Sequence, residues 1–306
     1  MRKPPIAQMP PWPARSAKHD KSRGIALVSV LWILALLAVI AGSFTANART
    51  DAKLAYNLVE NAKARALADA GVNRAILALL QPRSEELSEQ QWRRDGTLYR
   101  FSFGGGEVLA SIQDEAGKID LNAAPDALLR GLLVSVGVET GAAAALVDAI
   151  ADFRDADDLR RSNGAEADDY HAAGLATGPK NQPFRAVEEL QRVIGMTAAL
   201  FEKLLPALTV HSGRPGVDPA TAPDEARLAL EWMNSDEAEA LDAAGGLLAL
   251  RPATTYTLRA EAHTDGGGIY VREAVVLLGG DGQLFQIRAW RQGKRMAATG
   301  LLNLNL

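Results

Sequence analysis

Cysteine is absent from this chain of 306 residues, and histidine is scarce. The lack of cysteine excludes a disulfide scaffold, a thiolate metal site and thiol catalysis. The four histidines do not stand at metal-ligand spacing from one another: they are His19, His171, His211 and His263. The motifs GxSxG and HExxH and the phosphate-binding P-loop are also missing. We therefore expect a protein that is not an enzyme.

The chain also lacks an excess of charge of one sign. It has 33 basic and 37 acidic residues, so no global field favours nucleic acid or a polyanionic partner. Its length is sufficient for one large domain or two ordinary ones.

One long uncharged run is present near the N-terminus. Residues 1–23 hold six basic residues and one acid, and no charge follows from Gly24 to Ala48. About 20 apolar residues suffice to cross a bilayer as a helix. The positive-inside rule keeps the basic flank in the cytoplasm and places the rest of the chain outside.

Three interpretations of this run are open on its pattern alone. The first is a signal anchor, and the second is a cleaved signal peptide, since Ala46-Asn47-Ala48 fits a small-x-small cleavage site. Cleavage there would leave a periplasmic protein that starts at Arg49, although the run is longer than the roughly 7–15 residues usual for a signal peptide. A buried core helix is the third, and the basic flank argues against it.

The apolar run continues into an amphipathic segment without a break. Apolar residues recur at helical spacing up to Leu80, which predicts a helix of 55 residues over Ile25–Leu79, about 80 Å long. Two helices hinged near Gly42 or Gly71 are the alternative, since glycine weakens a helix.

Strand patterns flank a helical block. Thr97–Phe103 and Glu107–Gln113 predict a hairpin, and Thr255–His263, Ile269–Leu278 and Leu284–Trp290 predict a three-stranded meander. A stable sheet needs three or more strands, so we expect all five to form one sheet packed on the long helix. The insert between the hairpin and the meander runs from about Asp114 to Leu250, and no strand is expected in it.

The insert carries an internal similarity and two glycine turns. Pro125-Asp126 and Pro223-Asp224 each open an Ala/Leu-rich helix, which suggests two related modules. Residues 136–138 and 194–196 resemble helix-hairpin-helix turns, whose amides hold phosphate in DNA-binding proteins. A membrane-tethered nucleic-acid binder of the DNA-uptake type is therefore an alternative. However, residues 120–208 hold 14 acids against 8 bases, and phosphate contacts need clustered cations.

An acidic loop in the insert is the candidate metal site. Its acids are Asp152, Asp155, Asp157, Asp158, Glu166, Asp168 and Asp169. Such a density of hard oxygen donors suits Ca²⁺, although the spacing does not match an EF-hand. The alternative is a solvated loop neutralised by Arg154, Arg160 and Arg161.

The N-terminus resembles the class III signal of type IV pilins and pseudopilins. The residues that carry this resemblance are Lys21-Ser22-Arg23-Gly24-Ile25, followed by the apolar helix. It implies that a prepilin peptidase cuts between Gly24 and Ile25 and that Ile25 becomes N-methylated. Most pilins have glutamate at the position of Ser29, and its absence is typical of the general secretion pathway protein K family of minor pseudopilins.

The insert resembles the same family. The matching segments are residues 114–122, 151–157, 163–166, 169–170, 181–184 and 188–190. The resemblance implies an α+β fold, in which a pilin-like long N-terminal helix packs on a small antiparallel sheet with a large all-α, SAM-like insert between strands. The expected parts are a leader (1–24), the long helix (25–82), the first strands (83–113), two insert modules (114–212 and 213–250) and a C-terminal meander with its tail (251–306).

The resemblance also implies a function. It predicts a non-catalytic minor pseudopilin at the tip of a type II secretion pseudopilus, which initiates assembly and supports protein export across the outer membrane. The expected partners are I-type and J-type minor pseudopilins, the prepilin peptidase and the inner-membrane secretion platform, and not nucleic acid. The chain would cross the inner membrane once, with its C-terminal domain in the periplasm. Family members bind calcium in the insert, which makes Asp155, Asp157, Glu166, Asp168 and Asp169 the candidate Ca²⁺ ligands.

Overall fold

The structure is a computed structural model that describes residues 22–81, 91–233, 254–279 and 282–295, with side chains from residue 26 onward. The chain divides into two compact units, Met1–Leu58 and Val59–Leu306.

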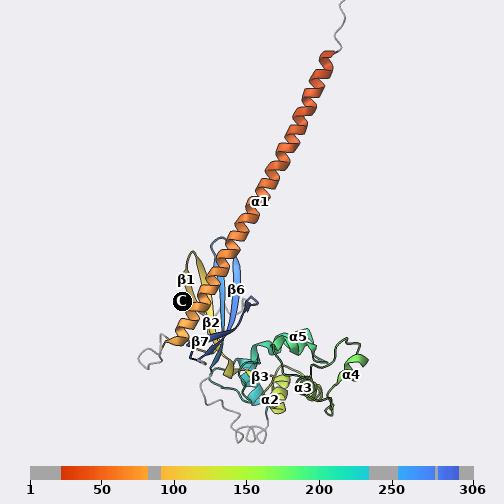
Figure 1. The fold of residues 1–306 in the computed structure, drawn as a ribbon, viewed down its shortest axis with the longest axis vertical. Coiled ribbons are helices and arrows are strands. Elements are labelled where there is room, and N and C mark those ends of the chain that lie inside the picture. The colour runs from red at the N-terminus through yellow and green to blue at the C-terminus, as the bar shows by residue number, and fades with distance from the viewer. Residues whose placement is uncertain (1–21, 82–90, 234–253, 280–281, 296–306) are drawn as a thin grey trace, which may run out of the picture. The chain divides into compact units, whose positions relative to one another are not determined.

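Helix α1 is continuous over Ser22–Leu80 (Figure 1). This confirms the predicted long helix and excludes a break at Gly42 or Gly71. In the first unit its large apolar side chains are exposed, among them Leu31, Trp32 and Phe44. The helix is long and apolar enough to cross a membrane.

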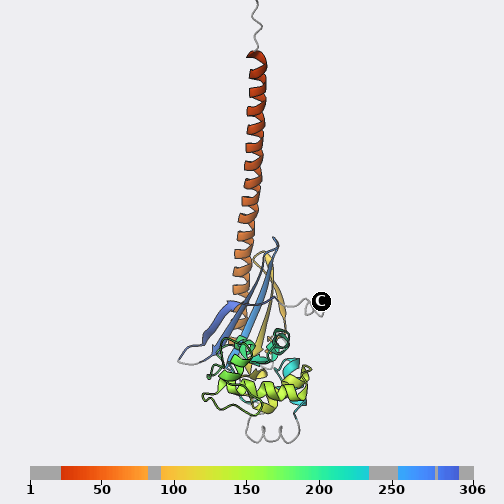
Figure 2. The same ribbon diagram turned by 90° about the vertical axis from the view of Figure 1, so that its right-hand side faces the viewer.

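The second unit contains the predicted five-stranded sheet. Its strands are β1 (Tyr99–Phe103), β2 (Gly106–Asp114), β5 (Thr255–Thr264), β6 (Ile269–Leu278) and β7 (Phe285–Gln292). They pair antiparallel in the order β1-β2-β5-β6-β7, so the last strand lies at one edge (Figure 2). The hairpin and the meander are confirmed, with ends that differ by one or two residues, and the insert joins β2 to β5.

The C-terminal part of α1 packs on one face of this sheet. Tyr256, Leu258, Ala260 and Ala262 share the buried face of β5, as their alternation predicts. Gly71 lies at the tightest point, because a Cβ there would stand 2.7 Å from both Ala260 Cβ and Val108 Cγ1. Gly71 therefore allows the helix to approach the sheet closely, and it is not a hinge.

The insert consists of short helices around a core of its own. These are η2 (Glu115–Gly117), α2 (Asp126–Ser135), α3 (Thr140–Arg154), α4 (Ala167–Ala172), η3 (Val187–Arg192), α5 (Ala198–Leu204), η4 (Leu205–Ala207) and α6 (Asp224–Glu231). Helices α2 and α6 start directly after Pro125 and Pro223, which confirms both predicted starts. Ala226 and Ala229 of α6 join the same buried cluster as Phe153. Residues 234–250 of the predicted second module lie outside the described residues.

The expectation of an insert without strands is wrong. Ile119–Asp120 (β3) and Leu208–Thr209 (β4) form a short parallel pair. Each strand has only two residues, too few for an alternating pattern to be visible in the sequence. The pair brings the start of the insert against the segment that follows α5 and η4.

Candidate functional site

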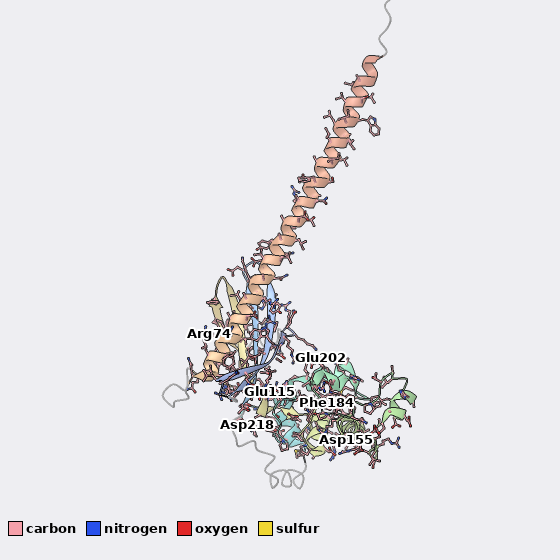
Figure 3. All side chains as sticks on the ribbon, viewed as in Figure 1. Arg74, Glu115, Asp155, Phe184, Glu202 and Asp218 are labelled. Carbon is pink, nitrogen blue, oxygen red and sulfur yellow. The ribbon has the colours of Figure 1, made fainter. Side chains whose placement is uncertain are left out.

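The acidic loop connects α3 to α4 and begins at a buried carboxylate. Asp152, in the last turn of α3, is fully buried and accepts hydrogen bonds from the backbone N–H of Arg161 at 3.3 Å. A Cβ on Gly164 would overlap Asp152 Oδ2, so only glycine lets the loop pass this close. The loop is thus folded back over the end of α3, near Asp155 (Figure 3).

Two further carboxylates of this loop have buried oxygens without partners. Both Oε1 and Oε2 of Glu166, and Oδ1 of Asp155, are buried and accept no hydrogen bond from any residue that the structure describes. Burial, followed by the negative charge of Asp152 and Asp155, raises the pKa of Glu166 to about 7. Burial and neighbouring acids, first Asp157, also raise the pKa of Asp155. These shifts indicate negative charge that the fold leaves uncompensated.

Arg154 and Arg161 offset part of the negative charge at Asp155, but within the described residues no arginine of the loop forms an ion pair with Asp155 or Glu166. Arg154 donates to the backbone carbonyl oxygens of Leu121 and Ala124. Arg161 pairs with Asp126, with its Nη1 at 2.6 Å from Oδ2. Arg160 pairs with Asp169 at 3.0 Å and not with Asp155 or Glu166. The alternative of a loop neutralised by its own arginines is therefore not supported for Asp155 and Glu166.

The five candidate ligands separate into two groups. Asp155, Asp157 and Glu166 influence one another electrostatically. Asp168 is exposed, and Asp169 accepts from the backbone N–H of Glu166 at 3.0 Å as well as from Arg160. The ligand assignment itself stays a prediction. Within the described ranges, no three His, Asp or Glu side chains are already arranged as a metal site.

Asn181 is a further oxygen donor that the sequence patterns did not single out. Its Nδ2 donates to Asp158 Oδ1 at 2.7 Å and to the carbonyl oxygen of Asp157 at 3.2 Å. Its φ is 50°, and its Oδ1 is buried without a partner in the described part of the chain. Asparagine tolerates this left-handed conformation better than most residues. Residues 181–184 are one of the segments that resemble the family, but that resemblance did not mark Asn181 as an oxygen ligand.

The helix-hairpin-helix turn between α2 and α3 has its amides occupied. Gly137 adopts a φ of +96° at the turn. The carboxylate of Glu139 then accepts from the N–H groups of Gly141 at 2.9 Å and Ala142 at 3.1 Å. A bound phosphate would need these donors, and the acid placed there repels it. The nucleic-acid alternative thus gains no support from this turn.

The sheet and the insert are joined through buried polar contacts around η2. Glu115 pairs with Lys118 at 2.7 Å and accepts a hydrogen bond from Thr209. Asp114, at the end of β2, accepts from the backbone N–H of Ala116 at 2.8 Å. Burial, and to a smaller extent the charge of Asp218, raise the pKa of Asp114 to about 6. Figure 3 marks Glu115 and Asp218 at this junction.

The predicted processing site lies at the start of α1. Gly24 and Ile25 are helical residues within its first turn, and Ser29 is exposed one turn further along. The cleavage between Gly24 and Ile25 stays a prediction.

Comparisons with known proteins connect this architecture to one family. A family model described as "Type II secretion system (T2SS), protein K" matches residues 109–213. Type II secretion system protein K of Klebsiella pneumoniae is 34% identical over 209 residues, which span 61% of this chain and 62% of that protein. Type II secretion system protein K of Pectobacterium carotovorum subsp. carotovorum is 31% identical over 242 residues, 71% of this chain and 72% of that protein.

A solved structure has a similar fold. It is a chain of the crystal structure of the GspK-GspI-GspJ complex from the enterotoxigenic Escherichia coli type 2 secretion system. The TM-score is 0.60 at 18% identity, and the match covers 81% of this chain and 100% of that chain. At this identity the likeness is one of fold.

Proposed function

The chain belongs to the type II secretion system protein K family, and on that premise we propose that it is the minor pseudopilin at the tip of the pseudopilus. In this role it initiates pseudopilus assembly and supports protein export across the outer membrane. It catalyses nothing itself and is a substrate of the prepilin peptidase.

The observation that carries this proposal is the insert between β2 and β5. Helix α1 and the sheet form a pilin-like unit, and the helices of the insert surround a separate hydrophobic core. Stacked subunits of a filament leave little space between their globular parts. An addition of this size therefore supports a terminal position, where nothing has to pack above it.

The residue at the start of the helix supports the same position. Ser29 has no charge, whereas the glutamate usual in pilins can pair with the terminal amine of a neighbour. A buried charge needs such a partner, so a subunit with serine lacks one docking contact with the next subunit. A tip subunit does not need that contact.

The proposed partners follow from the helix. The long apolar helix fits an inner-membrane-anchored component. We place the N-terminus in the cytoplasm and the second unit in the periplasm. The I-type and J-type minor pseudopilins pack along α1, and the similar Escherichia coli chain was solved in a complex of GspK with GspI and GspJ. The prepilin peptidase and the secretion platform of the inner membrane are the other partners.

Two measurements test the proposal. Intact mass and N-terminal sequencing of protein from membranes with active prepilin peptidase should give a start at Ile25 with one added methyl group. A start at Arg49 would instead indicate an ordinary signal peptide and would remove the pseudopilus role. Separately, Ser29→Glu and deletion of the insert should each allow the protein to occupy positions below the tip. If the deleted form remains only at the tip, the steric argument fails.

We also propose that the acidic loop binds Ca²⁺. The orphaned oxygens of Asp155 and Glu166 fit a hard cation, and Asp152, Asp157 and Asn181 supply further oxygens nearby. The cation would neutralise these acids and link the end of α3 to the start of α4.

Chelation tests the calcium proposal. It should lower the melting temperature of the wild-type protein, and Glu166→Gln should reduce this response. Glu231→Gln is the matched control, because Glu231 is an exposed acid of α6 outside the acidic loop and should leave the response unchanged. A wild-type melt that is insensitive to chelation contradicts calcium binding.

A further inference from the structure

Three residues of the insert have buried side-chain oxygens that accept no hydrogen bond. Among the residues that the structure describes, such oxygens belong only to Asp155, Glu166 and Asn181. The side chain of Glu166 is enclosed, because the residue is 9% exposed and neither of its carboxylate oxygens has a partner. Buried acceptors are normally satisfied, so three of these residues in one part of the insert point to a bound cation.

Asn181 lies beside the acidic loop, although it is distant from the loop along the chain. Its Nδ2 donates to Asp158 Oδ1 at 2.7 Å and to the carbonyl oxygen of Asp157 at 3.2 Å. The charges of these two acids in turn act on Glu166. The neighbours also fix the orientation of the amide, because both are acceptors and must face its nitrogen. The oxygen of Asn181 therefore points away from them and is left for a further contact.

The carboxylates of Asp155 and Glu166 need further donors to hold a cation. Ca²⁺ takes about six to eight oxygen ligands, and amide oxygens are among those it accepts. Within the described ranges, no three His, Asp or Glu side chains are arranged as a metal site. An amide oxygen from outside the loop would extend the donor set, and the position of Asn181 relative to the two carboxylates therefore matters.

The segment that carries Asn181 is held by the side chain of Asn122, in the turn before α2. Asn122 Oδ1 accepts from the backbone N–H of Phe184 at 2.8 Å, and its Nδ2 donates to the backbone carbonyl oxygen of Phe184 at 2.9 Å. A carboxylate cannot make both bonds, because it has no donor. The ring of Phe184 stacks on Phe153 at 5.0 Å, so its backbone and its side chain are both fixed (Figure 3).

The same turn also holds the end of α3. Arg154 donates to the carbonyl oxygens of Leu121 and Ala124, and Asp155 is the next residue along the chain. Residues 121–124 therefore fix two segments relative to each other, the one that carries Asp155 and the one that carries Asn181. Ligands held in place before binding give a higher affinity, because fewer groups have to be ordered when the cation binds.

We propose that Asn122 is a positioning residue for the cation of the acidic loop. Its amide holds Phe184 in place, so that Oδ1 of Asn181 joins the carboxylates of Asp155 and Glu166 around the cation. Without this amide, residues 181–184 lose both bonds to the turn and Asn181 withdraws from the cation. The inference rests on the proposed calcium binding, and it concerns a residue that does not touch the cation itself.

Tb³⁺ luminescence of the full-length protein in detergent, with displacement by Ca²⁺, measures both the affinity and the water bound to the metal. We expect Asn122→Ala to weaken binding by about 10-fold, the low end of the range for residues that orient a metal ligand. The luminescence lifetime should shorten in H₂O and not in D₂O, because water replaces the oxygen of Asn181. Leu133→Ala is the control, since it removes a buried side chain at the other end of α2. It should lower the melting temperature and leave the lifetime unchanged.

A double-mutant cycle tests whether Asn122 acts through Asn181. Asn181→Gly removes the amide oxygen, and glycine adopts the φ of 50° at this position without strain. This variant alone should weaken Tb³⁺ binding and shorten the lifetime in H₂O. Asn122→Ala added to it should cause no further change, because residues that act as one unit are not additive.

The outcomes separate this inference from the calcium binding on which it rests. A wild-type protein that binds neither Tb³⁺ nor Ca²⁺ contradicts calcium binding, and the inference is removed with it. Binding that Asn122→Ala leaves unchanged overturns only the role of Asn122. Additive losses, or weaker binding with an unchanged lifetime, indicate a general loosening of the insert and also overturn it. If circular dichroism shows Asn122→Ala to be unfolded, Asn122→Ser gives the same comparison, because a serine hydroxyl is too short to reach both backbone groups of Phe184.

Discussion

Gly117 provides a sharp test of the junction between sheet and insert. A Cβ at this position would overlap the carbonyl oxygen of Thr221, and would stand 2.5 Å from Thr221 C and 2.8 Å from Ala222 N. Ordinary contacts between such atoms are about 3.5–4 Å, so the two segments must separate by about 1 Å. The obstacles are backbone atoms, and no side-chain rotation can relieve the overlap.

The free-energy cost of Gly117→Ala follows from the contacts that this separation disturbs. Overpacking of this kind costs about 1–3 kcal/mol. Two hydrogen bonds cross the same interface, from Asp218 N to Ala116 O and from Gln113 Nε2 to Thr221 O, both 2.8 Å long. Each is worth about 1 kcal/mol. The lower chain entropy of the unfolded alanine variant returns about 0.4–1 kcal/mol. We expect a net loss of about 2–4 kcal/mol in the free energy of unfolding.

Thermal unfolding of the full-length protein in detergent, followed by circular dichroism, measures this loss. In a domain of this size it corresponds to a melting temperature lower by about 5–12 °C. Gly137→Ala is the control, since a Cβ there meets no atom within 4 Å and only its positive φ is unfavourable. A Gly117→Ala melting temperature as high as that of Gly137→Ala would refute the close packing of the junction.

Three further predictions concern the same unit. The raised pKa of Asp114 means that the folded state holds a proton that the unfolded state releases between pH 3.8 and about 6. The free energy of unfolding therefore falls as pH rises through this window, and Asp114→Asn should flatten the dependence in urea titrations at several pH values. Phe153 is fully buried and stacked on Phe184 at 5.0 Å, so Phe153→Ala should lower the free energy of unfolding by about 3–5 kcal/mol in the same titrations at pH 7. A loss below about 1 kcal/mol would contradict its central place in the insert core. Asp120→Ala should cost about 2–4 kcal/mol by losing, among others, the 2.8 Å bond from Gly213 N–H, whereas Asp120→Asn keeps an acceptor and should cost less.

Local patterns determined most of the elements. The long helix and the five strands follow from periodicities of 3.6 and 2, which need no knowledge of the fold. The helix starts after Pro125 and Pro223 follow from a proline at the helix boundary and an acid in the first turn, where the acid interacts favourably with the helix dipole. The resemblance to the family came instead from the segment around Gly24 and Ile25, the order of the matching segments of the insert, and Ser29.

Other features depend on contacts between distant segments. Strands β3 and β4 are too short to leave a pattern, and only their pairing across the insert defines them. Gly71 has the same effect on helix propensity whether it is a hinge or a contact point. The proximity of Ala260 and Val108 makes it a contact point.

For the acidic loop, the sequence alone does not distinguish the two interpretations. The sequence determined that many carboxylates and three arginines lie close together along the chain, and this is equally compatible with a metal site and with a neutralised loop. Only the tertiary structure shows which groups the arginines contact: Arg154 donates to carbonyl oxygens near the start of α2, and Arg161 pairs with Asp126. Asp155 and Glu166 are left with buried oxygens that nothing described in the chain satisfies. Which charges meet depends on how distant segments fold together, and spacing along a sequence does not contain that information.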